Sequence, residues 1–231
     1  SQFVSRFYNK RWDKYGGSID KRMAFPAEVL SKVLDAVGKD IAVIVKYSMT
    51  DGRSGGNTIE DGIEVARILE RTGAHMAVLS NGMNVESISA MFGSSLPKEV
   101  RTPPKNPIIR FGLEWQKISE FKTVEFKELY LLENAKQIRA AVSMPLCYIG
   151  GVHSRDNIET VMDEGLDAIA LGRALIHDPG LVNGLQDGSM SRTGCTACNP
   201  CVTMMYAPGG TACVLAEQND ADLNLIAASA D

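Results

Sequence analysis

Four short apolar runs alternate with helical segments along this chain, and this alternation constrains the fold more than any other feature. The runs lie at residues 41–45, 76–79, 145–149 and 166–171. Each is almost continuously apolar, which is typical of strands that are buried on both faces of a parallel sheet with helices outside. The sequence therefore predicts an α/β fold with a parallel sheet.

The segments between the runs have the spacing of amphipathic helices. In residues 22–37 an apolar residue recurs at every fourth position, which marks one face of a helix. These positions are Phe25, Val29, Val33 and Val37. Similar patterns predict helices at 58–71, 129–142 and 156–164. Residues 83–127 break the pattern and contain four prolines, so we expect an inserted loop over one end of the fold.

A (β/α)8 barrel and a doubly wound sheet both accommodate this alternation. A doubly wound sheet that binds a dinucleotide carries a GxGxxG turn after a strand, and no strand here is followed by one.

The 231 residues have a net charge of -4 and no cluster of Lys and Arg, which argues against nucleic acid as a partner. No apolar run approaches the roughly 20 residues that span a bilayer. We expect no membrane partner and a cytoplasmic location, and the start at Ser1 suggests a fragment.

Two glycine-containing corners follow the last two strands. They are Gly150-Gly151 and Gly172-Arg173, and each precedes a helical stretch. Glycine lets backbone N–H groups approach an anion, and a helix N-terminus adds partial positive charge. In (β/α)8 barrels the loops after the seventh and eighth strands usually form such a site. The corners predict a phosphate site, with a plain turn at each strand end as the alternative.

Four cysteines gather near the C-terminus, at Cys195, Cys198, Cys201 and Cys213. Four thiolates can close a 4Fe-4S iron-sulfur cluster or a tetrahedral zinc site, and buried cysteines without a metal are the alternative. Cys147 lies inside an apolar strand and is predicted to be a core residue. The three histidines form no spaced pair with a carboxylate, so we assign no catalytic residue; His153 alone is placed to approach the phosphate.

Residues 9–25 carry a family resemblance. The run from Asn9 to Ser18, with Lys21, Arg22 and Phe25 after it, resembles the NxRxDxYGGSxxNRxRF segment of the old yellow enzyme family of FMN-dependent NADH:flavin oxidoreductases, and in particular the branch with 2,4-dienoyl-CoA reductase. The resemblance continues in order through both corners and the cysteines. It implies the C-terminal half of a TIM (β/α)8 barrel, from just after the fourth strand through the eighth.

This resemblance sets the expected domains and the role of the YGGS loop. We predict a partial FMN-binding barrel at residues 1–190, with the inserted loop at about 83–127, and a Cys-rich C-terminal segment at 191–231. The YGGS loop is expected to be structural: two residues, Asp13 and Ser18, cap local backbone, and two arginines, Arg11 and Arg22, pair with carboxylates. Lys21 stands where the family often has Asn.

The resemblance also implies the cofactor contacts. Positions that hold the FMN phosphate correspond to Gly150, Gly151, Gly172 and Arg173, through backbone N–H groups and a guanidinium. Lys46 falls where the family places a cation beside the flavin pyrimidine, which stabilises the anionic reduced flavin; a lysine that extends into solvent is the alternative. Ser80 ends the next strand and is predicted to line the same mouth, or else to form a turn.

Family enzymes pass a hydride from NAD(P)H to FMN and then to an activated C=C or similar small-molecule acceptor. In the dienoyl-CoA reductase branch the cysteines bind a 4Fe-4S cluster, but here two residues, Asn199-Pro200, separate the second and third cysteines where that branch typically has three. The groups that grip the acceptor would precede Ser1, so we expect the isolated chain to be almost inactive. Open strand edges make a homo-oligomer an expected state. A non-redox phosphate-binding barrel and a metal-binding structural module are the alternatives.

Overall fold

The computed structural model describes residues 2–83, 86–96, 124–204 and 210–216. Contacts divide the chain into two compact units. The first comprises Ser1–Gly93 and Lys127–Leu171, and the second comprises Ser94–Phe126 and Gly172–Asp231. The boundary that we predicted after residue 190 stays a prediction. Most of the expected insertion at 83–127 lies outside the described residues.

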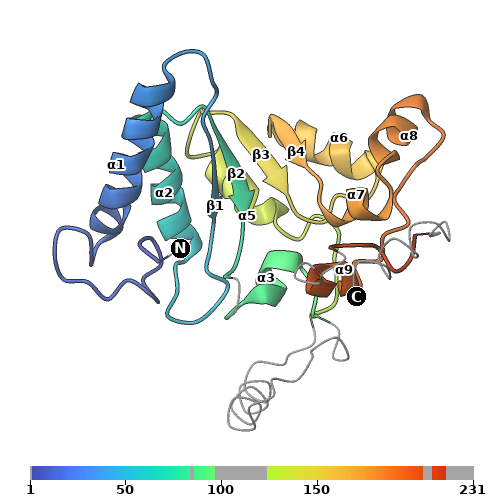
Figure 1. Cartoon of the computed structure of the whole chain (residues 1–231), viewed down its shortest axis with the longest axis horizontal. Helices are drawn as coiled ribbons and strands as arrows, with labels where there is room; N and C mark the ends of the chain where they lie inside the picture. Colours follow the sequence, from blue (N-terminus) through green and yellow to red (C-terminus); the bar gives the residue numbers. More distant parts are fainter. Residues whose placement is uncertain (1, 84–85, 97–123, 205–209, 217–231) are drawn as a thin grey trace, which may run out of the picture. The chain divides into compact units, whose positions relative to one another are not determined.

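A parallel four-stranded sheet forms the centre of the first unit (Figure 1). Its strands follow one another in sequence order: β1 (Ile44–Ser48), β2 (Met76–Ser80), β3 (Leu146–Ile149) and β4 (Ala168–Ala170). All three neighbouring pairs are parallel, as the apolar runs predicted. Because β1 and β4 each have one strand neighbour, they are the two edges of this sheet.

Helices connect the strands, as the periodicity predicted. The elements of this unit are α1 (Ile19–Val37), α2 (Ile59–Thr72), α3 (Ile88–Phe92), α5 (Leu132–Arg139) and α6 (Arg155–Asp163). Figure 1 shows α1 and α2 side by side, and the two helices pack against each other. α2 ends at Gly73, whose φ of 100° is a left-handed conformation that favours glycine. Alternating strands and helices therefore place the helices along one face of the sheet.

The hydrophobic core lies between that face and the helices. Four strand residues that point to it, Ala77, Leu79, Leu146 and Tyr148, are completely buried. The opposite face is open at the β1 edge, where Ile44 is 54% exposed and Lys46 is also exposed. In a complete (β/α)8 barrel the second face is the packed interior, filled by side chains from all eight strands. One covered face and one open face are what the predicted half barrel implies.

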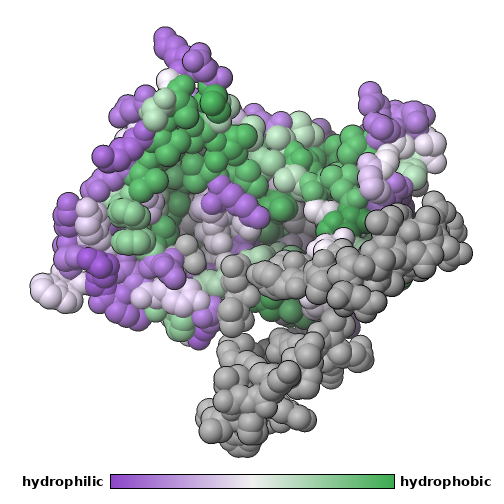
Figure 2. Space-filling model, viewed as in Figure 1, coloured by the Kyte–Doolittle hydropathy of each residue, from purple (hydrophilic) through white to green (hydrophobic). Residues whose placement is uncertain are grey.

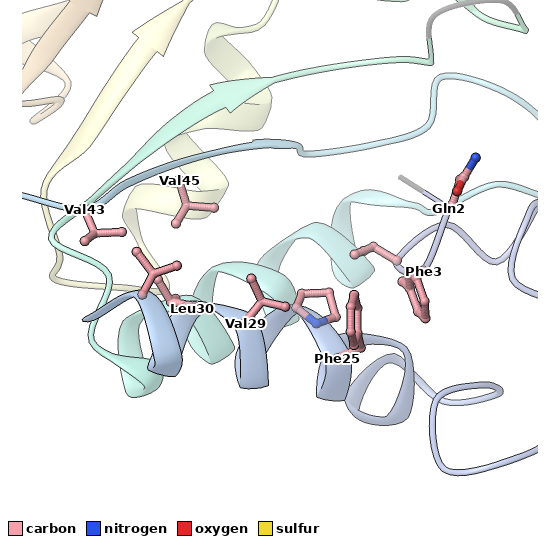
Figure 3. Close-up of a pocket in the computed structure, with 10 residues that line it drawn as sticks. Gln2, Phe3, Phe25, Val29, Leu30, Val43 and Val45 are labelled. Atoms are coloured by element: carbon pink, nitrogen blue, oxygen red, sulfur yellow. The ribbon is translucent and has the colours of Figure 1, made fainter. Parts of the chain in front are cut away.

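The periodic apolar stripe of α1 lines a groove at the β1 edge (Figure 3). Phe25, Val29 and Val33 are 39%, 43% and 40% exposed, and they face Val43 and Val45 across a groove of about 690 Å³. Figure 2 shows apolar surface over this part of the first unit. The stripe thus predicted the helix correctly, but other α1 residues bury most deeply against the core, Met23 and Leu30 among them.

Three short helices belong to the second unit: α7 (Arg173–His177), α8 (Leu181–Asp187) and α9 (Pro200–Thr203). The cysteine segment runs from α8 into α9 and continues to Cys213. Within the described ranges of both units, no helix combines the length and apolar character needed to cross a membrane.

Candidate functional site

Lys46 and Ser80 lie together at the carboxyl ends of β1 and β2. In the ladder, Lys46 stands opposite Val78 and Ser48 stands opposite Ser80, so the lysine and both serines share the open face of the sheet. Lys46, Ser48 and Ser80 also line one pocket of about 520 Å³. The ammonium group of Lys46 has no hydrogen bond or ion pair with any residue that the structure describes. The structure therefore brings Lys46 and Ser80 to one pocket, and their contact with a flavin stays a prediction.

Hydrogen bonds between the two strand ends hold this pocket in shape. The Met49 N–H donates to the Ser80 carbonyl at 2.8 Å, and the Ser48 hydroxyl donates to the Gly82 carbonyl at 2.9 Å. Asn81 accepts from the Thr50 N–H at 3.1 Å through its side-chain oxygen. Ser80 is thus the last residue of β2 and lines the pocket together with Gly82, and its contact with a cofactor stays a prediction.

The Gly150-Gly151 corner follows β3 at the same carboxyl edge of the sheet. Its φ angles are 143° and 72°, so both glycines occupy conformations that other residues rarely adopt. A Cβ at Gly151 would stand 2.9 Å from the Leu129 nitrogen, and that N–H donates to the Gly151 carbonyl at 3.1 Å. Backbone shape alone accounts for these two glycines, and their phosphate role stays a prediction.

Helix α6 begins just after this corner and is capped by its own sequence. The Ser154 hydroxyl accepts from the Asn157 N–H at 3.2 Å, and Asn157 in turn accepts from the His153 N–H at 2.8 Å. His153 is buried, with 7% of its surface exposed. Its backbone N–H is thus used by the helix cap, and its approach to a phosphate stays a prediction.

Gly172 and Arg173 open the second unit. Gly172 has a φ of -119°, and a Cβ placed there would meet nothing within 4 Å. Packing therefore does not demand glycine at this position, whereas its ψ of -91° lies outside the regions that other residues favour. Arg173 donates through Nη1 to the side chain of Asn199, and its guanidinium lies 5.6 Å from the centre of the Phe126 ring. Sequence reasoning did not predict the contact with Asn199.

These residues fit the parts of FMN that the resemblance assigns to them. In the first unit, a cation without a partner stands beside two hydroxyls on an open sheet face, which suits an electron-rich pyrimidine edge. In the second unit, Gly172 precedes the guanidinium of Arg173, a group that pairs well with phosphate.

The four C-terminal cysteines form a cluster of free thiols in the second unit. Cys201 and Cys213 are buried, Cys195 is half-buried and Cys198 is exposed. Burial raises the pKa of Cys195 and Cys201, and the other cysteines of the cluster raise it further, while Arg173 lowers it. Sequence reasoning missed one neighbour: the Nδ1 atom of His177 lies 3.4 Å from the Cys213 sulfur.

This cluster gives the metal prediction no support. Within the described residues, no group of three or more His, Cys, Asp and Glu side chains is arranged to hold a metal ion. The spacing of the cysteines had already departed from the iron-sulfur pattern at Asn199-Pro200. Cys147 is buried, as predicted for a core residue, and burial raises the pKa of its thiol.

The YGGS loop is built largely as expected. Asp13 accepts from the Tyr15 N–H at 3.0 Å and pairs with Arg11. A Cβ at Gly16 would stand 2.0 Å from the Arg11 carbonyl oxygen, so only glycine fits this turn. The expectation for Ser18 was wrong in one respect: it occupies the N-cap position of α1, but its hydroxyl makes no capping hydrogen bond.

A parallel sheet in sequence order, with helices over one face and strand ends at one edge, defines the fold as part of a TIM barrel. Residues 1–112 match the NADH:flavin oxidoreductase / NADH oxidase family. The 4,4'-dithiodibutanoate disulfide reductase of Rhodococcus erythropolis is 36% identical over 93% of this chain and 53% of its own length. The chain belongs to this family, that of old yellow enzyme.

Two further comparisons agree with this assignment. The NADH oxidase of Thermoanaerobacter brockii is 31% identical over 86% of this chain and 26% of its own length. A solved structure of a 2-naphthoyl-CoA reductase matches 90% of this chain and 30% of its own with a TM-score of 0.61, at 23% identity, and this likeness shows the fold. The chain thus spans about half the length of the first relative and about a quarter of the second.

Proposed function

We propose that this chain provides one part of the FMN site in an NAD(P)H-dependent flavin oxidoreductase. The whole enzyme passes a hydride from NAD(P)H through FMN to an activated C=C or similar small acceptor. The observation that carries the proposal is the position of Lys46. Its unpaired ammonium shares the open sheet face with Ser48 and Ser80, at the strand ends where barrel enzymes place their active sites.

Each residue has a separate task in this proposal. Lys46 holds a positive charge beside the pyrimidine, where negative charge develops when FMN, which supplies the redox chemistry, is reduced. Ser48 and Ser80 offer hydroxyl groups on the same face. Gly172 and Arg173 bind the phosphate through a backbone N–H and a guanidinium.

Two classes of hydride acceptor are compatible with the proposal. An activated C=C takes up a hydride and a proton. The name of the Rhodococcus relative supplies a second class, an organic disulfide with two carboxylate groups. Reduction of a disulfide consumes the same hydride and a proton, and it splits one S–S bond into two thiols. Both acceptors therefore suit one hydride donor.

Anaerobic spectroscopy of the FMN-loaded protein tests this function. NADH is expected to bleach the flavin band, and addition of 2-cyclohexenone or 4,4'-dithiodibutanoate is expected to restore it. Lys46→Met should slow the bleaching, whereas the exposed control Lys39→Met should not. A whole enzyme that binds no flavin overturns the proposal. A colourless, zinc-containing protein would instead favour a metal-binding module.

The activity of the isolated chain forms a second test. Because the first unit leaves one sheet face open, we propose that the 231-residue chain alone binds FMN weakly and turns over almost no acceptor. Titration with FMN, followed by fluorescence, measures the affinity. Rapid NADH-dependent reduction of an enone by this chain alone would contradict the proposal.

A further inference from the structure

Arg53 is a half-buried arginine whose guanidinium forms no hydrogen bond or ion pair with the residues that the structure describes. It lies in the loop between β1 and α2, with its guanidinium carbon 3.9 Å from the centre of the Phe7 ring. Its Nε atom is buried and makes no hydrogen bond. Among the described residues, no carboxylate forms an ion pair with Arg53, whereas Arg6 and Arg22 of the same unit both pair with Asp61.

The Phe7 ring orients this guanidinium. A cation over an aromatic face is attracted by the ring, and a planar guanidinium held there keeps its N–H groups in a fixed fork. A buried N–H without an acceptor costs free energy, which a ligand that accepts a hydrogen bond would recover. The N–H groups of the Arg53 guanidinium are therefore hydrogen-bond donors that a ligand with acceptor atoms could engage.

The charges of Asp51, Glu86 and Arg53 all act on the Tyr8 hydroxyl, so both carboxylates belong to the surroundings of Arg53. Asp51 accepts from the Ser5 hydroxyl at 2.6 Å and from the Asn57 N–H at 2.6 Å. A side-chain hydrogen bond with Glu86 raises the pKa of Tyr8 to about 12. Glu86 nevertheless keeps one buried oxygen, Oε2, without a partner. Because both carboxylates repel an anionic ligand, they disfavour a dianion more than a monoanion.

The loop of Arg53 belongs to the active end of the sheet. It begins directly after the strand end of β1, and Asp51 lines the same pocket as Lys46 and Ser80. Substrates of (β/α)8 enzymes bind among the loops at the carboxyl ends of the strands. A group bound by Arg53 would therefore lie at the same end of the fold as the proposed flavin site.

We propose that Arg53 binds a carboxylate group of the acceptor. The proposal rests on the proposed function, and it adds that the physiological acceptor is a carboxylic acid rather than a neutral enone. The guanidinium fork matches the two oxygens of a carboxylate in a bidentate pair. A phosphate dianion is the poorer match, because one arginine stands near two acidic side chains.

Calorimetry on the FMN-loaded, oxidised protein tests this without turnover. The probes are 4,4'-dithiodibutanoate and its dimethyl ester, together with cinnamate and methyl cinnamate. We expect each acid to bind more tightly than its ester. Arg53→Met should weaken the binding of the acids by about 10- to 100-fold, the range expected when a charged hydrogen bond is lost. The binding of the esters should stay almost unchanged. The exposed Arg71→Met variant is the control and should change neither.

Glu86→Gln provides a test of opposite sign. The amide oxygen still accepts from Tyr8, but one negative charge is removed, so we expect the acids to bind a few-fold more tightly. Opposite effects at Arg53 and Glu86 cannot come from general damage to the fold.

Three results would overturn the proposal. In the first, the acids bind the unaltered protein no more tightly than their esters do. In the second, Arg53→Met weakens the binding of acid and ester equally. In the third, Arg53→Met weakens the binding of NADPH but not that of the acids. Failure of the proposed function has a different signature, since it appears as absence of bound flavin or of flavin reduction by NADH.

Discussion

Arg22 and Asp61 form an ion pair between the starts of α1 and α2, with Nη2 and Oδ1 3.1 Å apart. The arginine side chain is 4% exposed. Its guanidinium also donates to the carbonyls of Val4 and Gly17 and to the Asn57 side chain. One buried cation thus joins the N-terminal segment, the YGGS loop and both helices. Burial lowers the pKa of Arg22, although arginine remains charged at neutral pH.

Removal of this cation should destabilise the first unit. We expect Arg22→Met to lower the free energy of unfolding by about 3 kcal/mol, because Asp61 and two carbonyls lose a buried donor. Urea denaturation followed by circular dichroism measures the change. Arg67→Met removes a pair in which both side chains are more than a third exposed, and it should cost less than about 0.5 kcal/mol. Equal effects of the two variants would contradict this role.

Glu70 ties α2 to the start of β3. Its Oε1 atom accepts from the Ser143 N–H at 2.6 Å, the Ser143 hydroxyl at 2.8 Å and the Met144 N–H at 2.8 Å. These hydrogen bonds lower the pKa of Glu70. We expect Glu70→Gln to cost about 1 kcal/mol at pH 7, since a charged acceptor becomes neutral.

The contribution of Glu70 should depend on pH in one direction. A carboxyl with a lowered folded-state pKa stabilises the fold above its unfolded pKa, near 4.3, and this stability is lost as the pH falls through the folded value. The difference between the unaltered protein and Glu70→Gln should therefore shrink below about pH 4. Glu133→Gln, at a residue with an 85% exposed side chain, is the control. A difference that grows on acidification would sink this account.

Lys46 should set the reduction potential of the bound flavin. Loss of its positive charge in Lys46→Met destabilises the reduced form, so we expect the midpoint potential to fall by about 30 to 60 mV, equivalent to about 1.4 to 2.8 kcal/mol for two electrons. Spectroelectrochemistry of the FMN-loaded protein measures it. An unchanged potential would assign Lys46 to the solvent-extended alternative.

The thiols of the cysteine cluster should react at different rates. Cys198 is exposed, whereas Cys201 and Cys213 are buried, and burial raises the pKa of Cys201. With a thiol reagent at pH 8, we expect one fast phase that Cys198→Ala abolishes and Cys201→Ala preserves. Complete protection of all four, together with iron-sulfur or zinc in the sample, would show a metal site instead.

The apolar face of α1 should drive self-association of the chain when it is isolated. Val29 and Val33 line an apolar groove beside the unpaired edge of β1. We expect Val29→Lys to shift sedimentation toward the monomer with little loss of stability, because Val29 is already 43% exposed. Val182→Lys, at a 50% exposed residue of α8, is the matched control. Association that only the control reduces would argue against the groove.

Much of the site could be predicted because a short stretch of sequence is enough to mark where a strand ends. Apolar runs located the four strands, and because β1 and β2 pair in parallel, Lys46 and Ser80 both line one pocket. The first strand was nevertheless placed at 41–45 instead of Ile44–Ser48. The apolar pattern placed this strand too early in the sequence. Its last residues, Lys46 to Ser48, also pair with β2, and side chains on the open face of the sheet need not be apolar.

Sequence alone determined the strand and helix alternation, the tight turns and the family, because backbone preferences and motifs act over a few neighbouring residues. Tertiary structure decided which side chains meet. The His177–Cys213 contact spans 36 residues, and the unpaired guanidinium of Arg53 over Phe7 spans 46 positions of sequence. Such contacts depend on the path of the whole chain, since any local segment is compatible with many partners. The open face of the sheet has the same origin, because only the folded arrangement shows which strand surfaces the helices leave uncovered.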